Sequence, residues 1–193
     1  ETEDLVRWIL EEYSKGYNES LRILDIGTGS GCIAVSLAKH LKVAKVSGLD
    51  ISTDALEMAR LNADKNAVQI EFLLGDILSD TTSINIESKF DIIVSNPPYV
   101  RALEKNKMNA NVLEHEPDIA LFVPDKDPLV FYKAIAIFAK EHLVINGSLY
   151  LEINQYLGKE MLDLLTSYGY QEVELRQDIF GNDRMVKGVF VNG

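Results

Sequence analysis

The sequence predicts an α/β fold with a doubly wound, seven-stranded, mostly parallel sheet that ends in a C-terminal antiparallel hairpin strand. Strand-like and helix-like patterns alternate along most of the chain, as in parallel sheets whose strands are joined by right-handed helical crossovers. The last two strand patterns are separated by a short connection, so we expect a hairpin there. Glycine-rich and polar motifs follow several strands, and ligands of such sheets bind at the carboxyl ends of the strands.

The strands are identified from short apolar runs bounded by glycine or polar residues. L-R-I-L-D-I and K-V-S-G-L-D are the first two, and F-D-I-I-V-S is the fourth. The full set is expected at 21–26, 45–50, 69–75, 90–95, 147–153, 173–177 and 185–191.

Apolar residues recur at helical spacing between these strands. A leading helix is expected over 2–14, within the segment 1–16, because Thr2 is a suitable N-cap and Gly16 a suitable stop. The later helices are expected from Ile33 to Leu41, from a Ser52 cap through Ala63, from Asp127-Pro128 through Phe138, and over 157–168.

The composition fits one globular domain over residues 1–193, with 47% hydrophobic and 25% charged residues. The first residue is Glu1 rather than methionine, which favours a fragment of a longer protein. No apolar run approaches the ~20 residues that span a bilayer, so we expect no membrane association. The net charge is −11 and the 19 lysines and arginines are scattered, which argues against stable nucleic-acid binding.

The cysteine and histidine content excludes two further classes. A single cysteine, Cys32, rules out an internal disulfide framework and fits a reducing, cytoplasmic location. Because Cys32 lies in an apolar helical stretch, we expect it to be buried. His40, His115 and His142 are dispersed without metal-ligand spacing, so no metal site is predicted.

The motif D-I-G-T-G-S-G at 25–31 joins the first strand to the first crossover helix. Glycines let the backbone turn sharply and approach a ligand closely, although a tight turn alone would also use them. The spacing is not that of dinucleotide-binding loops, and no lysine follows as in a phosphate-binding loop. A carboxylate at Asp25 would attract a cation. The cofactor-binding residues predicted here are Asp25, Gly27, Thr28, Gly29, Ser30 and Gly31.

Two further acidic residues close the next strands. Asp50, followed by Ile51, is placed to accept the hydroxyls of a ribose, or else to interact with the dipole at the amino end of the next helix. Asp76 is placed to accept an adenine amine while Ile77 packs on the ring, or else to cap a loop. Ribose and adenine contacts without a phosphate cradle indicate a nucleoside cofactor that lacks pyrophosphate. S-adenosylmethionine fits, and its product is S-adenosylhomocysteine.

N-P-P-Y at 96–99 follows the fourth strand. The prolines stiffen the backbone, so the side-chain oxygen of Asn96 and the carbonyl of Pro97 would aim two acceptors at one planar –NH2 group. Tyr99 would supply an aromatic face near developing positive charge. We predict Asn96, Pro97 and Tyr99 as catalytic, and Asn96 to Tyr99, including Pro98, as substrate-binding, with Asn96 also touching the cofactor. The segment 100–127 has little periodicity and is predicted as an active-site loop.

Together, D-I-G-T-G-S-G, G-L-D, G-D-I and N-P-P-Y resemble class I S-adenosylmethionine-dependent methyltransferases, which have a Rossmann-like sheet. Further segments resemble the release-factor glutamine methyltransferases, the HemK/PrmC family. These segments are E-T-E-D-L-V (1–6), E-H-E-P-D-I-A-L (114–121), F-Y-K-A-I (131–135), L-E-I (151–153) and D-I-F-G-N-D-R (178–184).

The resemblance implies methylation of the glutamine side-chain amide in the Gly-Gly-Gln tripeptide of class I peptide-chain release factors. A small helical substrate-recognition domain precedes the catalytic domain in that family and is absent from this sequence. Four alternatives stay open: a ribosomal-protein glutamine methyltransferase, an adenine amino-methyltransferase on DNA or RNA, a nicotinamide dehydrogenase and a non-catalytic binding module. The sequence leaves open whether His115 touches substrate, and whether Phe180 to Arg184 covers the site or only turns the hairpin.

Overall fold

The computed structural model describes residues 2–14, 20–79, 86, 88–98, 100–101, 122–123 and 127–191. A seven-stranded sheet has the order β3-β2-β1-β4-β7-β9-β8, in which β9 pairs antiparallel with both β7 and β8 and all other adjacent strands are parallel. This arrangement confirms the predicted Rossmann-like fold and its antiparallel C-terminal strand. The strands are β1 (Arg22–Ile26), β2 (Lys45–Asp50), β3 (Ile70–Leu74), β4 (Phe90–Ser95), β7 (Leu143–Glu152), β8 (Tyr170–Gln177) and β9 (Asp183–Phe190).

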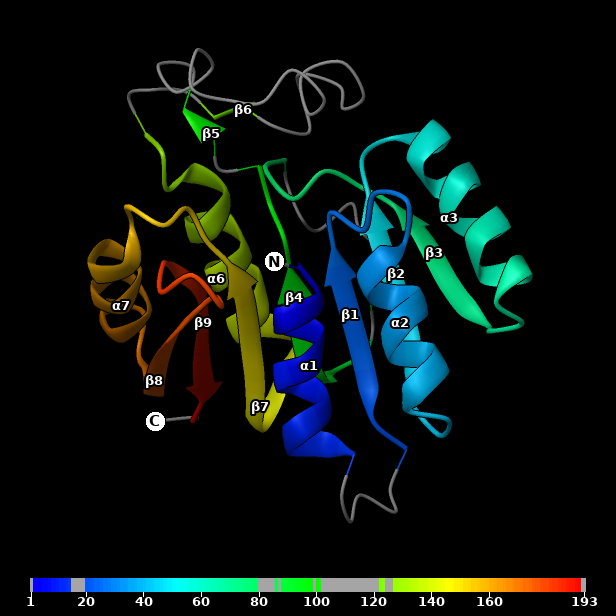
Figure 1. Cartoon of the computed structure of the whole chain (residues 1–193), viewed down its shortest axis with the longest axis horizontal. Helices are drawn as coiled ribbons and strands as arrows, with labels where there is room; N and C mark the ends of the chain where they lie inside the picture. Colours follow the sequence, from blue (N-terminus) through cyan, green and yellow to red (C-terminus); the bar gives the residue numbers. More distant parts are fainter. Residues whose placement is uncertain are drawn as a thin grey trace.

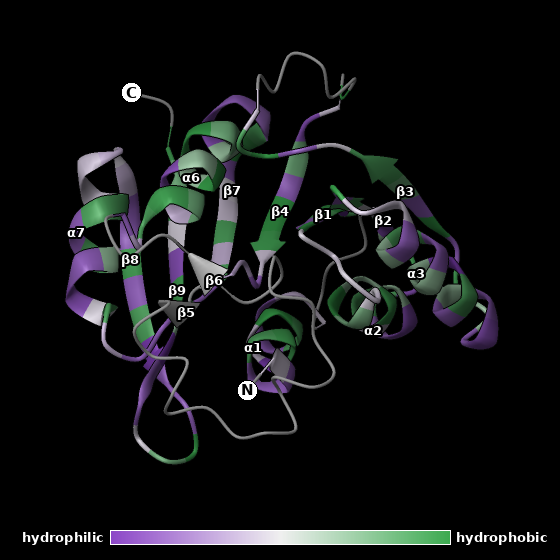
Figure 2. Ribbon diagram, turned by 90° about the horizontal axis from the view of Figure 1, so that it is seen from above, coloured by the Kyte–Doolittle hydropathy of each residue, from purple (hydrophilic) through white to green (hydrophobic). Residues whose placement is uncertain are grey.

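The helices cover both faces of this sheet. Figures 1 and 2 show α1, α2 and α3 on one face, and α6 and α7 on the other. Because both faces are covered, the central strands are apolar on both sides. Ile92 and Val94 of β4 pack in the core with α1 and α2, whereas Ile93 packs with α6 and α7. The helices are α1 (Thr2–Tyr13), α2 (Cys32–His40), α3 (Thr53–Lys65), α6 (Val130–His142) and α7 (Gly158–Ser167).

Helix α1 is fixed firmly to the middle of the sheet. The ring of Trp8 is 1% exposed and meets the ring of Tyr150 edge-on at 5.4 Å between centroids. Glu12 accepts hydrogen bonds from Trp8, Tyr150 and Lys187. Burial raises the pKa of Glu12, but these donors and the charge of Lys187 outweigh it and hold the pKa below its ordinary value. These contacts hold the middle and the carboxyl end of α1 against the sheet.

The strand register determines which residues meet at the carboxyl edge. Ile26 of β1 pairs with Ser95 of β4, and Ser95 pairs in turn with Leu151 of β7. The residues that follow these three are Gly27, Asn96 and Glu152. The chain order reverses between β1 and β4, which is where sheets of this kind bind their ligands.

Two strands begin three or more residues earlier than the sequence predicts, and β9 begins two residues earlier, at Asp183. β7 begins at Leu143 rather than 147, and β8 at Tyr170 rather than 173. Asn146 and Glu172 have positive φ values of 65° and 48°, and the register of each strand with its neighbour shifts nearby. Such irregularities resemble turns in the sequence, so the predicted strands start only after them.

Other local predictions have mixed outcomes. Ser52 caps α3 as predicted, because its hydroxyl accepts from the Ala55 N–H at 3.2 Å. Cys32 is exposed, so the prediction of a buried cysteine is wrong; as the first residue of α2 it lies beside Ser30 rather than in the core. Helix α6 begins at Val130, since the Asp127 side chain caps a turn through the Leu129 N–H instead of starting the helix.

The predicted loop 100–127 lies largely outside the described residues. Its described parts include β5 (Val100–Arg101) and β6 (Phe122–Val123), which pair as a short parallel ladder. In the portion of the chain that the structure describes, no helix combines the length and apolar character needed to cross a membrane.

Candidate active site

The glycine motif forms an open loop between β1 and α2. The N–H groups of Gly27 and Thr28 both donate to the carbonyl of Leu49, which ties the loop to β2. Gly27 and Gly29 have φ values of 70° and 55°, and a Cβ at either position would meet no atom within 4 Å. Gly31 differs, because a Cβ there would lie 3.1 Å from the Cβ of Ala59. The first two glycines therefore leave space for a ligand, and the third lets α2 approach α3.

Asp25 lies beneath this loop, wholly buried in β1. Its Oδ2 accepts from the Thr28 hydroxyl at 2.6 Å and from the Ala34 N–H at 3.2 Å. Its Oδ1 is buried without a hydrogen-bond partner within the described residues. Burial raises the pKa of Asp25 to about 7, although the bonds from Thr28 and Ala34 lower it and the charge of Asp50 raises it further. An added positive charge nearby would favour the ionised form.

Asp50 closes β2, and both of its carboxylate oxygens accept from backbone N–H groups. Its Oδ1 accepts from the Ser52 N–H at 2.9 Å, and its Oδ2 accepts from the Gly29 N–H at 2.8 Å. The carboxylate thus holds both the glycine loop and the turn into α3. Each carboxylate oxygen has a further lone pair, so a second acceptor role toward hydroxyl groups is chemically open. Ile51 beside it is 53% exposed.

Asp76 and Ile77 follow β3, and both are half-buried. Asp76 Oδ1 accepts from the Leu78 N–H at 2.9 Å, which shapes the turn after the strand. The loop-capping role is therefore present in the structure. Asp76 and Asp50 lie on neighbouring strands, because Asp50 pairs with Leu74. The predicted ribose and adenine contacts therefore come from adjacent strand ends.

Asn96 and the prolines follow β4 at the switch point. Ser95 is completely buried and donates its hydroxyl to the carbonyl of Ile26 at 2.6 Å, which locks the end of β4 to the end of β1. The Asn96 Nδ2 donates to the hydroxyl of Thr2 at 3.1 Å. Pro97 is buried and Pro98 half-buried. Tyr99 lies outside the described residues. The structure thus brings Asn96 next to the glycine loop.

Thr2 and Glu152 contribute to the site in a way that the sequence does not predict. The sequence predicts Thr2 only as a helix cap, whereas its hydroxyl contacts Asn96 and donates to Glu152 Oε2 at 2.9 Å. Glu152 is 1% exposed at the carboxyl end of β7. One signal for Glu152 is present: it is the single charged residue in the predicted strand 147–153. No signal in the sequence links Thr2 to Asn96.

The segment 178–184 turns the β8–β9 hairpin. The Asp178 carboxylate accepts from the N–H groups of Phe180 and Asn182 at 2.8 and 3.0 Å. Ile179 and Phe180 at the tip are 77% and 78% exposed. Arg184 is buried, and its Nε lies 3.6 Å from Asp178 Oδ2. In this structure the segment therefore shapes the hairpin.

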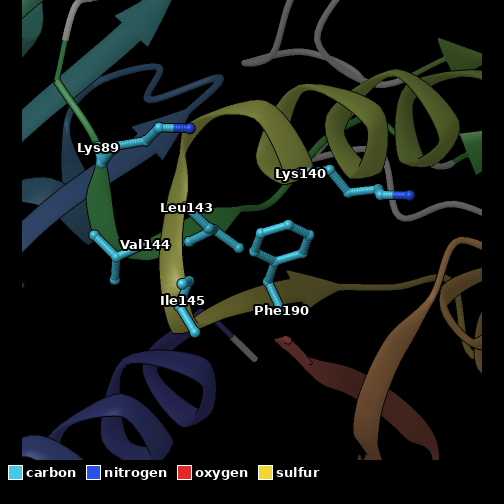
Figure 3. A pocket seen from close by; sticks show the side chains of 6 residues that line it. All are labelled: Lys89, Lys140, Leu143, Val144, Ile145 and Phe190. Atoms are coloured by element: carbon cyan, nitrogen blue, oxygen red, sulfur yellow. The ribbon is translucent and has the colours of Figure 1, made fainter. Parts of the chain in front are cut away.

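The described residues contain no group of three or more histidine, cysteine or acidic side chains that could hold a metal ion. His40 and His142 each bond a backbone carbonyl of their own helix, and His115 lies outside the described residues. A cavity of about 490 Å³ lies at the amino ends of β4 and β7, opposite the glycine loop. Figure 3 shows the side chains that line it: Lys89, Lys140, Leu143, Val144, Ile145 and Phe190.

The sheet order, the open glycine loop and the Asn-Pro corner define the class as Rossmann-like methyltransferases. The chain belongs to the methyltransferase small domain family, whose model matches residues 6–119. It is 55% identical over 188 residues to a release factor glutamine methyltransferase of Flavobacterium psychrophilum, covering 97% of this chain and 65% of that protein. A release factor glutamine methyltransferase of Bacteroides thetaiotaomicron is 48% identical, with 96% and 65% coverage. The resemblance drawn from the sequence is confirmed, and the chain spans about 65% of the length of these curated relatives.

Solved structures support the fold. A methyltransferase from Pyrococcus furiosus matches with a TM-score of 0.68 at 19% identity, over 96% of this chain and 82% of that one. A 16S rRNA N2 G1207 methyltransferase of Thermus thermophilus, solved with AdoMet and guanosine, has the same TM-score and identity, over 96% and 41%. At this identity the likeness extends to the fold alone.

Proposed function

We propose that this chain is the catalytic domain of an enzyme that transfers a methyl group from S-adenosylmethionine to the side-chain amide of the glutamine in the Gly-Gly-Gln tripeptide of class I peptide-chain release factors. The observation that carries this proposal is the position of Asn96, which lies at the switch point of the sheet beside the open glycine loop. The names of the relatives at 55% and 48% identity support the same substrate. Such an enzyme acts in the cytoplasm, where release factors are found.

The residues around the glycine loop fit this cofactor. Gly27 and Gly29 leave open space above the loop, and Asp50 retains lone pairs for ribose hydroxyls. The exposed Ile51 and the half-buried Ile77 offer apolar surface to an adenine, and Asp76 would accept from its amine. The buried oxygen of Asp25 that has no partner within the described part of the chain provides a negative field for a cation. Because Asp25 is fully buried, it acts through this field and not by direct contact. Ser30 and Gly31 complete the loop.

When bound, the cofactor supplies an electrophilic methyl group on a positively charged sulfonium. The chain must then orient a weak nucleophile, because the lone pair of an amide nitrogen is delocalised into its carbonyl. Asn96 Oδ1 and the Pro97 carbonyl would accept the two N–H bonds of the substrate amide, which draws electron density to the nitrogen. Acceptors held by proline-stiffened backbone need no reorganisation as charge develops on the nitrogen. In this mechanism Pro98 maintains the corner and Tyr99 lines the substrate.

A methyl-transfer assay tests this function. Labelled S-adenosylmethionine is supplied with a class I release factor, with the same factor carrying alanine in place of the Gly-Gly-Gln glutamine, and with double-stranded DNA. We expect label only on the unaltered release factor. Label on DNA would instead favour an adenine amino-methyltransferase, and label on the alanine-substituted factor would refute the target glutamine.

An Asn96→Ala variant tests the mechanism separately. We expect turnover to fall by about 10²–10³-fold, because a preorganised hydrogen-bond partner of the reacting group is lost. The affinity for S-adenosylhomocysteine should change little, since only one predicted cofactor contact is lost while the glycine loop and Asp50 are intact. Equal turnover in the variant would discard the role of Asn96.

A further inference from the structure

We infer that Thr2 is a positioning residue that holds the Asn96 amide in one of its two possible orientations, with Nδ2 toward Thr2 and Oδ1 toward the substrate. The inference rests on the proposed function, because it concerns how Asn96 accepts from a substrate –NH2 group. It begins from a chain of two hydrogen bonds: Asn96 Nδ2 donates to the Thr2 hydroxyl at 3.1 Å, and that hydroxyl donates to Glu152 Oε2 at 2.9 Å.

The acceptor Glu152 determines which atom donates in each of these two hydrogen bonds. When Glu152 is ionised its carboxylate only accepts hydrogen bonds, so the single hydroxyl proton of Thr2 is used on Glu152. Thr2 is left with lone pairs, and only a donor can pair with them. The amide of Asn96 must therefore turn its –NH2 toward Thr2. A carbonyl oxygen in the same place would face the Thr2 lone pairs without a proton between them.

The orientation of the Asn96 amide also determines where its oxygen, Oδ1, lies. With Nδ2 on Thr2, Oδ1 is directed away from Thr2, and it accepts no hydrogen bond from the described residues. An acceptor is what a substrate –NH2 group requires. The reversed amide would present a second –NH2 group to the substrate and oppose binding. The orientation of Asn96 thus decides whether the corner accepts or repels an amine.

The fold holds both Glu152 and Thr2 in place. Glu152 is 1% exposed and lies at the end of β7, one residue beyond the Leu151–Ser95 pair. Thr2 is the first residue of α1, which is anchored to the sheet through Trp8 and Glu12. The orienting hydroxyl therefore comes from a rigid helix and not from a loop, which suits a group that must stay fixed.

Two substitutions of Thr2 test the inference. Thr2→Val keeps the shape of the side chain and removes the hydroxyl, whereas Thr2→Ser keeps the hydroxyl and is the matched control. We expect Thr2→Val to lower kcat for glutamine methylation by about 10-fold or more, the loss of roughly one well-placed hydrogen bond, and Thr2→Ser to stay within about 3-fold of the parent. The affinity for S-adenosylhomocysteine should not change in either variant.

A double-mutant cycle separates positioning from general damage. If Thr2 acts through Asn96, the effect of Thr2→Val should vanish in an Asn96→Ala background. An equal fold-loss in both backgrounds would overturn the inference while leaving the proposed function standing.

A spectroscopic measurement does not depend on activity. The Asn96 side-chain –NH2 signal, assigned in an ¹⁵N–¹H spectrum by its absence in Asn96→Ala, should shift and exchange faster in Thr2→Val but not in Thr2→Ser. An unchanged signal in Thr2→Val would refute the orienting bond even if the chain methylates no glutamine. Absence of methylation by the parent chain, with the signal shifted, would refute the proposed function alone.

Discussion

The buried carboxyl of Asp25 should make the affinity for the cofactor depend on pH, and the substitution Asp25→Asn should abolish this dependence. Burial raises the pKa of Asp25 from its ordinary 3.8 to about 7 in the ligand-free protein. Asp25→Asn is nearly isosteric, removes the ionisation and keeps an oxygen for Thr28 and Ala34. The substitution should therefore weaken cofactor binding and stabilise the ligand-free fold at high pH.

The binding effect follows from the fraction of Asp25 that is ionised. With a pKa of about 7, the carboxyl is roughly 90% protonated at pH 6 and roughly 90% ionised at pH 8. A bound cation lowers the pKa of a nearby carboxyl, so affinity rises as the pH rises through about 7. The affinity for the cofactor can rise by at most about tenfold between pH 6 and pH 8. Asp25→Asn should lack this gain.

The stability of the ligand-free fold changes in the opposite direction to cofactor affinity as the pH rises. Because the folded-state pKa lies above the unfolded one, the folded protein holds a proton that the unfolded chain releases, and stability falls as the pH rises from about 4 to about 7. The difference in pKa corresponds to about 4 kcal/mol for the ionised form. An asparagine leaves an amide N–H without a partner, which costs about 1–2 kcal/mol. Asp25→Asn should thus gain about 2 kcal/mol at pH 8 and lose that gain near pH 5.

Calorimetry and denaturation together provide the assay. The ratio of parent to Asp25→Asn affinity for S-adenosylmethionine is measured at pH 6, 7 and 8, so that titration of the ligand itself cancels. Urea unfolding of the ligand-free proteins is measured at pH 5 and pH 8. A ratio that stays constant over this range, or an Asn variant less stable than the parent at pH 8, would refute the reasoning.

Three further substitutions test separate parts of the account. Gly31→Ala, at φ 83° and with its Cβ 3.1 Å from that of Ala59, should lower the free energy of unfolding by about 1–3 kcal/mol in urea; an unchanged midpoint would contradict the tight contact. Gly29→Ala, in open space at φ 55°, should cost only about 1 kcal/mol but weaken S-adenosylhomocysteine binding by about tenfold or more in calorimetry, and equal affinity would show that no ligand lies there. Glu12→Gln should cost about 1–2 kcal/mol at pH 7, and the difference from the parent should disappear as the pH falls through the lowered pKa of Glu12; a difference that persists in acid would exclude the ionic contribution.

The sequence predicted most of the sheet because local patterns mark its strands. β2 and β4 fall at their predicted residues, since turn residues bound each apolar run. The errors at β7 and β8 come from Asn146 and Glu172, whose positive φ values interrupt strands that continue on either side. A short-range pattern cannot distinguish such an interruption from a strand end.

The candidate site was predictable where its residues follow strands, as Gly27, Asp50 and Asn96 do. It was not predictable where contact depends on the packing of distant segments. Thr2 and Asn96 are 94 positions apart, and only the docking of α1 against the sheet brings them together. Asp25 Oδ1 likewise is buried with no hydrogen-bond partner among the described residues, and the sequence does not show this burial.

A crystal structure with S-adenosylhomocysteine and a Gly-Gly-Gln peptide bound tests the account most directly. We predict that the glutamine amide nitrogen donates to Asn96 Oδ1 and to the Pro97 carbonyl, and faces the cofactor sulfur above Gly27 and Gly29. A glutamine amide bound away from Asn96, or the cofactor bound away from the glycine loop, would contradict it.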